Sequence, residues 1–275
     1  MPGAGSWNVI SGENSNRVIL VVDFPAAGRT EAGFIELAAR MGPEYKFLQT
    51  APPSVRPDQR PGSDAYIQPW IQAAKRGGWQ VTAVLGYCVG SIYAAPIAEG
   101  VSEWQRIAPK VILLDPLSGD IRLLAAEMYK MIDRLSPLLS SEEIGQAGKR
   151  TAELTESEPG DVAEAAIGLV GIYREIGSAA FGRLGLDESR GNEMIQLFES
   201  YMSWISVAAQ IDPRRTWKRS VAIMSADYVK QAAEDPSAGI LNSIVDRTIP
   251  LDVTHGDLLR SDATVEAVRG QLEAS

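Results

Sequence analysis

Residues 81–94 of this 275-residue chain read VTAVLGYCVGSIYA, and this stretch decides the fold. The short apolar run from Val81 to Leu85 predicts a buried strand, and residues 89–99 predict a helix. Residues 86–90, GYCVG, lie at the junction, with one glycine two positions before the cysteine and one two positions after it. A strand that turns directly into a helix, in a chain where strands and helices alternate, indicates a mostly parallel sheet with helices on both faces.

The pattern G-x-C-x-G resembles the nucleophile elbow of the α/β-hydrolases, with cysteine in place of serine. In such a tight turn, a side chain at Gly86 or Gly90 would clash with its surroundings. The turn lifts Cys88 clear of the sheet at a helix N-terminus, where the partial positive charge favours a thiolate. The motif therefore predicts that Cys88 is a nucleophile.

Cys88 is the only cysteine of the chain, and His255 is its only histidine. A lone cysteine is usually a small buried hydrophobe, and a lone histidine is usually structural. Here the two occur in the order nucleophile, acid, histidine that this motif requires. Asp115 and Asp227 each follow a predicted strand between the elbow and the histidine, so either could orient His255. From the residues alone, one of them is the acid and the other caps a loop.

Composition limits the function classes. The formal net charge of −9 argues against general nucleic-acid binding, and one cysteine with one histidine argues against a zinc site. The first residues lack the basic and apolar regions of a signal peptide, and no apolar run approaches the roughly 18 residues needed to cross a bilayer. A single cysteine fits a reducing compartment. We expect a cytoplasmic protein without a membrane span.

The pattern of apolar residues predicts an α/β core interrupted by helices. Strands are expected over 7–10, 17–24, 45–48, 81–85, 111–114, 220–224 and 248–253, and core helices over 31–41, 63–76, 89–99 and 263–273. Thr30 is the expected N-cap of the first helix. Three further helices are expected over 121–135, 161–176 and 192–211, with a mobile segment over 137–160 that could gate access. We thus expect a core of residues 1–117 and 218–275, with a helical lid over 118–217.

A second motif extends the resemblance. Residues 21–28, VVDFPAAG, resemble the strand-end Phe-Pro motif of thioesterases from polyketide and nonribosomal peptide assembly lines. The spacing to the elbow, the helical insertion and the late Thr-His-Gly loop also match, so the resemblance covers most of the chain. Within that group, a chain of this length with an elbow cysteine resembles the Dieckmann cyclases of tetramate and pyridone biosynthesis, of the tirandamycin, streptolydigin and nocamycin type.

The resemblance implies specific roles for the site residues. It implies a triad of Cys88, Asp115 and His255, with Asp227 at the position that free-standing editing thioesterases use instead. It also implies that the backbone N–H groups of Ala27 and Val89 form the oxyanion hole. Arg29 departs from the pattern, because the editing thioesterases have a second glycine there.

The implied substrate is a β-ketoacyl–aminoacyl thioester on the phosphopantetheine arm of a carrier protein, with no other cofactor. A basic cluster, defined here as Arg214, Arg215, Lys218 and Arg219 around Trp217, either faces an acidic carrier domain or is a solvated loop. Three alternatives remain open: a hydrolytic thioesterase, a non-catalytic acyl-binding protein, and a dienelactone-hydrolase-like enzyme. The last also has a Gly-Tyr-Cys elbow, and its acid would be Asp227.

Overall fold

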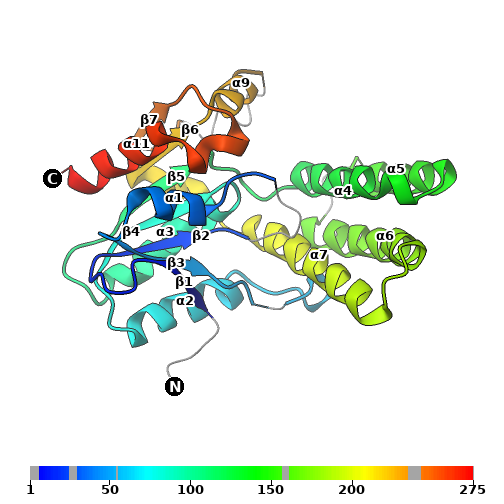
Figure 1. The fold of residues 1–275 in the computed structure, drawn as a ribbon, viewed down its shortest axis with the longest axis horizontal. Coiled ribbons are helices and arrows are strands. Elements are labelled where there is room, and N and C mark those ends of the chain that lie inside the picture. The colour runs from blue at the N-terminus through cyan, green and yellow to red at the C-terminus, as the bar shows by residue number, and fades with distance from the viewer. Residues whose placement is uncertain (1–5, 25–29, 54, 157–160, 235–242, 275) are drawn as a thin grey trace. The chain divides into compact units, whose positions relative to one another are not determined.

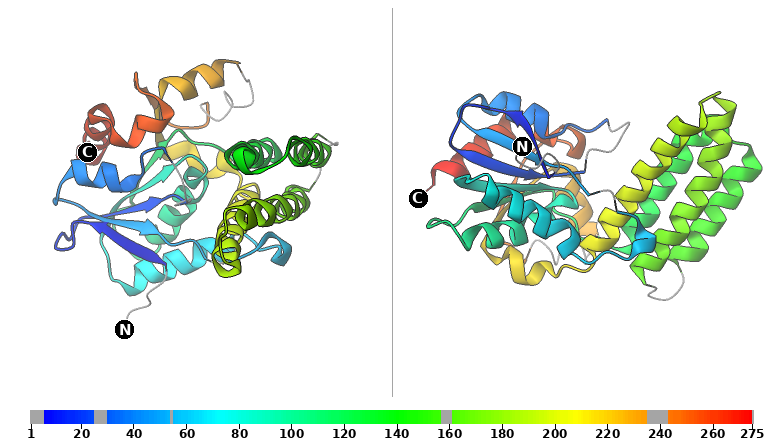
Figure 2. Two further views of the ribbon diagram at one scale, coloured as in Figure 1. Left: turned by 45° about the vertical axis from the view of Figure 1, so that its right-hand side comes forward. Right: turned by 90° about the horizontal axis from the view of Figure 1, so that it is seen from below.

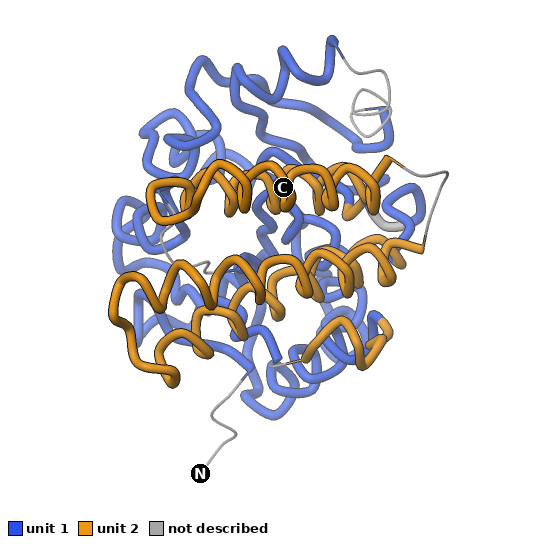
Figure 3. The backbone as a smooth tube through the Cα atoms, turned by 90° about the vertical axis from the view of Figure 1, so that its right-hand side faces the viewer, with its two compact units in different colours: residues 1–53, 63–118, 211–275 blue, residues 54–62, 119–210 orange. Residues whose placement is uncertain are grey.

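The computed structural model describes residues 6–24, 30–53, 55–156, 161–234 and 243–274, which fall into two compact units (Figure 3). Unit 1 comprises residues 1–53, 63–118 and 211–275, and unit 2 comprises residues 54–62 and 119–210. The short segment 54–62 belongs to unit 2, where the 3₁₀ turn at residues 57–59 packs against the helices of residues 162–183 and 188–208, and Arg60 forms ion pairs with Asp161 and Glu164. Residues 211–217 belong to unit 1, where Trp217 is fully buried.

Unit 1 is built on one seven-stranded sheet in the described residues, with the order β1-β3-β2-β4-β5-β6-β7. The strands are β1 (Trp7–Ser11), β2 (Val18–Val22), β3 (Lys46–Thr50), β4 (Val81–Tyr87), β5 (Lys110–Leu114), β6 (Ser220–Met224) and β7 (Arg247–Pro250). Only the pairing of β1 with β3 is antiparallel among the pairings of these strands. Every residue of β2 is at most 2% exposed, as its unbroken apolar run requires of a strand covered on both faces.

The register of the central strands places their carboxyl ends side by side. Tyr87 at the end of β4 lies opposite Leu114 at the end of β5, and Leu114 lies opposite Ile223 of β6. The residues that follow these strands therefore meet at one edge of the sheet.

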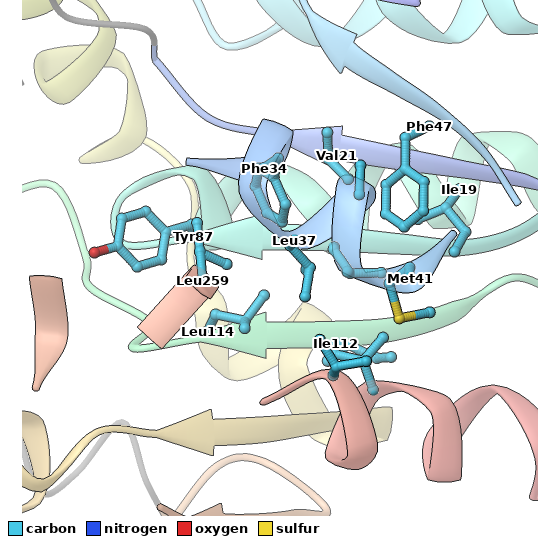
Figure 4. Packing of buried hydrophobic residues seen from close by; sticks show 14 of the residues in the cluster. Ile19, Val21, Phe34, Leu37, Met41, Phe47, Tyr87, Ile112, Leu114 and Leu259 are labelled. Atoms are coloured by element: carbon cyan, nitrogen blue, oxygen red, sulfur yellow. The ribbon is translucent and has the colours of Figure 1, made fainter. Parts of the chain in front are cut away.

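Helices cover both faces of this sheet (Figures 1 and 2). In the part of unit 1 that the structure describes, the helices are α1 (Phe34–Met41), α2 (Asp64–Arg76), α3 (Gly90–Ser102), α8 (Pro213–Thr216), α9 (Ala226–Glu234) and α11 (Asp262–Glu273), with 3₁₀ turns at Trp217–Arg219 and His255–Arg260. On one face, α1 packs against α11 and against the His255–Arg260 turn. On the other face, α2 packs against α3. Figure 4 shows the apolar cluster on the first face, which includes Phe34, Leu37 and Tyr87.

Unit 2 is all helical in its described residues. It contains the 3₁₀ turns Pro57–Gln59 and Ser136–Leu138 and the helices α4 (Ile121–Leu135), α5 (Ser141–Thr155), α6 (Val162–Arg183) and α7 (Glu188–Ala208). An aspartate or serine side chain caps the N-terminus of each of these four helices. The predicted bounds of α4 are those observed, and α4 packs against the other three helices, as its broad apolar surface requires.

Two local predictions are wrong. Residues 141–155 form α5, where a mobile segment was expected. The helix expected from residue 31 with Thr30 as its cap instead begins at Phe34, because the Glu36 carboxylate accepts the backbone N–H of Gly33 and fixes the first turn there.

Candidate active site

The elbow places Cys88 between β4 and α3 in a strained backbone conformation. Cys88 has a φ of 52°, in the left-handed region that residues other than glycine rarely adopt. The Ser91 N–H donates to the Cys88 carbonyl (3.1 Å), and the Ser91 hydroxyl donates to the Gly86 carbonyl (3.0 Å). These bonds hold a partly buried Cys88 at the tip of the turn, directly before the N-terminus of α3.

The two elbow glycines are required by close backbone approach. A Cβ added to Gly86 would lie 2.4 Å from the Cα of Ser91, and one added to Gly90 would lie 2.1 Å from the carbonyl oxygen of Val22. Both obstacles are main-chain atoms, which cannot rotate away as a flexible side chain could. This elbow therefore accepts only glycine at both positions.

Asp115 and His255 are brought into direct contact. The Asp115 Oδ2 lies 2.7 Å from the His255 Nδ1, and the Asp115 Oδ1 accepts the backbone N–H of Ser225 at 2.7 Å. Asp115 is fully buried and also has a positive φ, of 43°. With a buried carboxylate as its partner, Nδ1 is assigned the proton, which leaves Nε2 as the nitrogen that can exchange a proton with another group.

Backbone hydrogen bonds connect Cys88 to the end of β5, which Asp115 directly follows. The Cys88 N–H donates to the Leu114 carbonyl (2.9 Å), and the Leu117 N–H donates to the Cys88 carbonyl (3.2 Å). Main-chain hydrogen bonds therefore connect the elbow to the residues on both sides of Asp115.

Asp227, the second candidate acid, contacts the backbone of His255 and not its ring. The Asp227 Oδ2, at the start of α9, accepts the backbone N–H of His255 at 2.8 Å. Asp115 therefore contacts the imidazole ring, whereas Asp227 holds the main chain on which the ring is mounted. The sequence left these two roles open, and the geometry separates them.

Two tyrosines at the site were missed by the sequence reasoning. The Tyr87 hydroxyl lies 2.9 Å from the His255 Nε2, and its ring stacks on the imidazole with centroids 5.0 Å apart. The available signal was strand alternation, because Tyr87 shares one face of β4 with Ala83 and Leu85. The Tyr228 hydroxyl donates to the Pro116 carbonyl (2.7 Å). Burial, with smaller effects from Asp115 and Cys88, raises the pKa of Tyr228 far above its ordinary value, so this hydroxyl stays protonated.

The expected oxyanion donors are only partly within the described residues. Val89 follows Cys88 directly and is buried at the start of the elbow helix. Ala27 and Arg29 lie outside the described residues, so the second expected donor and the departure at Arg29 stay sequence-based predictions.

The structure describes every residue of the basic cluster; of the neighbouring residues, only the side chain of Thr216 lies outside the description. All four basic side chains of the cluster are exposed, and Arg214 also pairs with Asp212. Trp217 is buried, and its Nε1 donates to the Ser91 carbonyl at 3.3 Å. The tryptophan therefore anchors this segment to the first turn of α3 and offers no exposed ring to a partner.

The described residues contain no group of three or more histidine, cysteine, aspartate or glutamate side chains arranged to hold a metal ion. None of the described helices is both long enough and apolar enough to cross a membrane.

Comparison with known proteins identifies the fold. No family model matches the sequence, and no curated protein matches it. Among solved structures, the chain is similar to the NocB thioesterase domain in covalent complex with a fluorophosphonate nocardicin G analogue (TM-score 0.53, 14% identity, 98% of this chain and 100% of that one). It is also similar to the Vlm2 thioesterase domain bound to a dodecadepsipeptide (0.51, 17%, 96% and 95%). A third similar structure is the enol-lactonase from Burkholderia xenovorans LB400 (0.53, 13%, 98% and 96%). At such low identities these likenesses show the fold alone, and they confirm the fold class predicted from the sequence.

Proposed function

Since this chain has the α/β-hydrolase fold, we propose that it is an acyl-transfer enzyme in which Cys88 is the nucleophile, His255 the base and Asp115 the orienting acid. The observation that carries this proposal is the 2.7 Å contact between Asp115 and the His255 Nδ1, at the strand end that is bonded to the Cys88 main chain. A nucleophile, a base and a group that orients the base are the parts that covalent acyl transfer requires.

Within that class, we propose a Dieckmann cyclase that forms a tetramic acid or pyridone ring. The substrate is a β-ketoacyl–aminoacyl chain held as a thioester on a carrier protein. The Cys88 thiolate attacks the thioester carbonyl, and the pantetheine thiol leaves with a proton from His255. The exchange replaces one thioester with another, so the acyl carbon stays activated.

Ring closure then uses the same three side chains. His255 takes the acidic proton between the ketone and the amide carbonyls of the bound chain. The resulting enolate carbon attacks the Cys88 thioester carbonyl, a carbon–carbon bond forms, and the Cys88 thiolate is expelled. A serine ester would be the poorer electrophile for this carbon nucleophile, which is the chemical argument for cysteine in the elbow.

Cyclisation also requires that water be excluded, because water competes with the enolate for the thioester. We propose that the inserted helices α4 to α7 act as the lid that supplies this exclusion and holds the polyketide chain folded for attack. A carrier protein is proposed as the partner on chemical grounds, since the leaving group is the thiol of a pantetheine arm.

The placement of Asp227 bears on the dienelactone-hydrolase-like alternative. That reading requires Asp227 to orient the imidazole, but Asp227 accepts from the backbone of His255, and Asp115 is the residue in contact with the ring. The placement of the acid does not test the hydrolytic alternative, because Cys88, Asp115 and His255 can also deliver the acyl group to water, so only an assay of products separates a hydrolytic thioesterase from a cyclase.

The test is to incubate the protein with a β-ketoacyl–aminoacyl thioester of a short pantetheine mimic and to identify products by mass spectrometry. We expect a product lighter than the free acid by one water, and none with Cys88→Ala. The Cys88→Ser variant is the informative control, because a serine ester is expected to shift the product toward the free acid. If the wild-type protein yields only the free acid, it is a hydrolase and the cyclase proposal is wrong.

A further inference from the structure

Tyr87 contacts His255 in three ways. Its hydroxyl oxygen lies 2.9 Å from the His255 Nε2 and 3.0 Å from the His255 carbonyl oxygen. Its ring stacks on the imidazole at an interplanar angle of 14°. The ring belongs to the apolar cluster of unit 1, and the hydroxyl points away from the other labelled residues of that cluster (Figure 4). The side chain is 3% exposed, so its position is fixed by packing.

The hydroxyl has one proton and two acceptors on the same histidine. When the imidazole is neutral, Nε2 carries a lone pair and the Tyr87 O–H donates to it. When the imidazole is protonated, Nε2–H becomes a donor, and the Tyr87 oxygen accepts from it while its O–H turns to the His255 carbonyl. No proton leaves Tyr87 in either state, and only the C–O bond rotates.

We propose that Tyr87 is a positioning residue for His255, which keeps Nε2 hydrogen-bonded in both protonation states and favours the imidazolium that pairs with the Cys88 thiolate. This inference rests on the proposed function, in which the Cys88 thiol passes its proton to Nε2. For the pair to form, the Tyr87 O–H turns from Nε2 to the His255 carbonyl, which frees the Nε2 lone pair. The Cys88 S–H bond then breaks, the His255 Nε2–H bond forms and Tyr87 stays neutral.

The count of hydrogen bonds is the argument for this role. The protonated state has two bonds through the Tyr87 hydroxyl, and one of them has a charged donor, whereas the neutral state has one ordinary bond. Titratable and charged groups on the elements packed around the histidine include Glu31, Asp115, Asp227, Tyr228, Asp257 and Arg260, and these stay in place in every variant below.

The chain is well suited to a direct test, because it has one cysteine and one histidine. The experiment measures the rate of Cys88 alkylation by iodoacetamide from pH 5 to pH 10, in the wild-type protein and in Tyr87→Phe. This variant keeps the ring and removes only the hydroxyl. We expect its alkylation rate at pH 7 to fall about three- to tenfold and its profile to move to higher pH, as the loss of a hydrogen bond to a charged group predicts.

Three controls complete the set. Tyr45→Phe removes a hydroxyl from a residue of the same apolar cluster and is expected to leave the profile unchanged. Tyr87→Leu also removes the stacked ring, so it is expected to fall below Tyr87→Phe in rate. His255→Ala shows whether the alkylation rate of the Cys88 thiol depends on the histidine. Thermal unfolding of each variant confirms that it is folded at the assay temperature.

The outcomes separate this inference from the proposed function. If His255→Ala leaves alkylation unchanged, the Cys88–His255 pair itself is wrong. If His255→Ala slows alkylation but Tyr87→Phe equals or exceeds the wild-type rate, the pair stands and the role of Tyr87 is wrong.

A second test uses NMR spectroscopy of protein labelled with ¹⁵N histidine, in which the ring signals come from His255 alone because it is the only histidine. In the neutral ring, Tyr87→Phe should shift the Nε2 resonance and leave the protonated Nδ1 resonance in place. Unchanged Nε2 would overturn the inference.

Discussion

At the scale of single residues, the site stores backbone strain at two of its three members. Cys88 and Asp115 both have left-handed φ angles, which cost a residue other than glycine about 1–2 kcal/mol each. The strain is held by fixed neighbours: the Ser91 N–H and hydroxyl at the elbow, and the Ser225 N–H at the buried carboxylate. Strain of this kind survives only where the surrounding structure over-determines it, and it concentrates at functional sites.

The two aspartates give a matched pair of variants. In Asp115→Asn, one oxygen that faces the imidazole or the Ser225 N–H becomes an amide, and the tautomer of His255 is no longer fixed. We expect acyl transfer to fall about 10³–10⁴-fold, as in triads that lose their acid. In Asp227→Asn, an amide oxygen still accepts the His255 N–H, so the loss should stay below about tenfold.

Turnover of the pantetheine thioester at pH 7 measures both variants, with circular dichroism as the check on folding. Equal losses in the two would contradict the separate roles assigned to them. A larger loss in Asp227→Asn would favour the dienelactone-hydrolase-like alternative.

The elbow glycines allow a prediction on stability. Gly86→Ala places a Cβ 2.4 Å from the Ser91 Cα, so the elbow must shift or the protein must unfold more easily. We expect the free energy of unfolding to fall by about 2–4 kcal/mol, measured by urea denaturation. Gly270→Ala is the control, because this exposed position within α11 has no atom within 4 Å of the added Cβ. It should stabilise the protein by about 0.5–1 kcal/mol.

At the scale of elements, the feature that stands out is the attachment of α5 to α6. Arg183 of α6 donates to both carboxylate oxygens of Glu143 in α5, at 2.8 and 2.9 Å, and Arg150 of α5 pairs with Glu175 of α6. Glu143 also accepts the Ser140 N–H (2.7 Å), and the Ser140 hydroxyl accepts the Glu143 N–H (3.2 Å). One carboxylate thus caps α5 and ties it to its neighbour.

This arrangement predicts a dependence on acid. Hydrogen bonds from Arg183, and then from Ser140, lower the pKa of Glu143 from 4.5 to about 2. Because the folded state lowers this pKa, the carboxylate stabilises the fold above about pH 4.5, and the contribution is lost as the pH falls toward 2.

The measurement is the melting temperature of the wild-type protein minus that of Glu143→Gln, between pH 6 and pH 2. We expect this difference to be positive at pH 6 and to vanish near pH 2. Glu153→Gln, an exposed position on the same helix, should show a smaller change. A difference that does not depend on pH would mean that the Glu143 carboxylate contributes no charge-dependent stability.

At the scale of the whole molecule, the sequence predicted the parts whose cause is local. The strand and helix around Cys88 follow from an apolar run and two glycines, and α4 follows from its periodicity together with Asp120 as its cap. The helix α5 was missed, because its composition suggested disorder and outweighed the Ser140-x-x-Glu143 capping box that marks its start.

The sequence predicted the candidate site residues but not the contacts between residues that are far apart in the chain. Nothing local distinguishes Asp115 from Asp227, since both follow strands that end at the same edge of the sheet. The choice depends on which carboxylate the imidazole faces, and that is set by packing across 140 positions of sequence. The contact of Tyr87 with His255 spans 168 positions and was invisible for the same reason.

The two edge strands of the sheet bear on whether the protein aggregates at high concentration. Among the described strands, β1 and β7 are outermost, and each has backbone groups that could template the strand of another molecule. The pairing of β1 with β3 shifts register between Val9 and Ser11, while β7 is four residues long, begins with Arg247 and ends with Pro250. An irregular register at one edge, and an arginine with a proline at the other, discourage the edge-to-edge strand pairing that leads to polymers and fibrils.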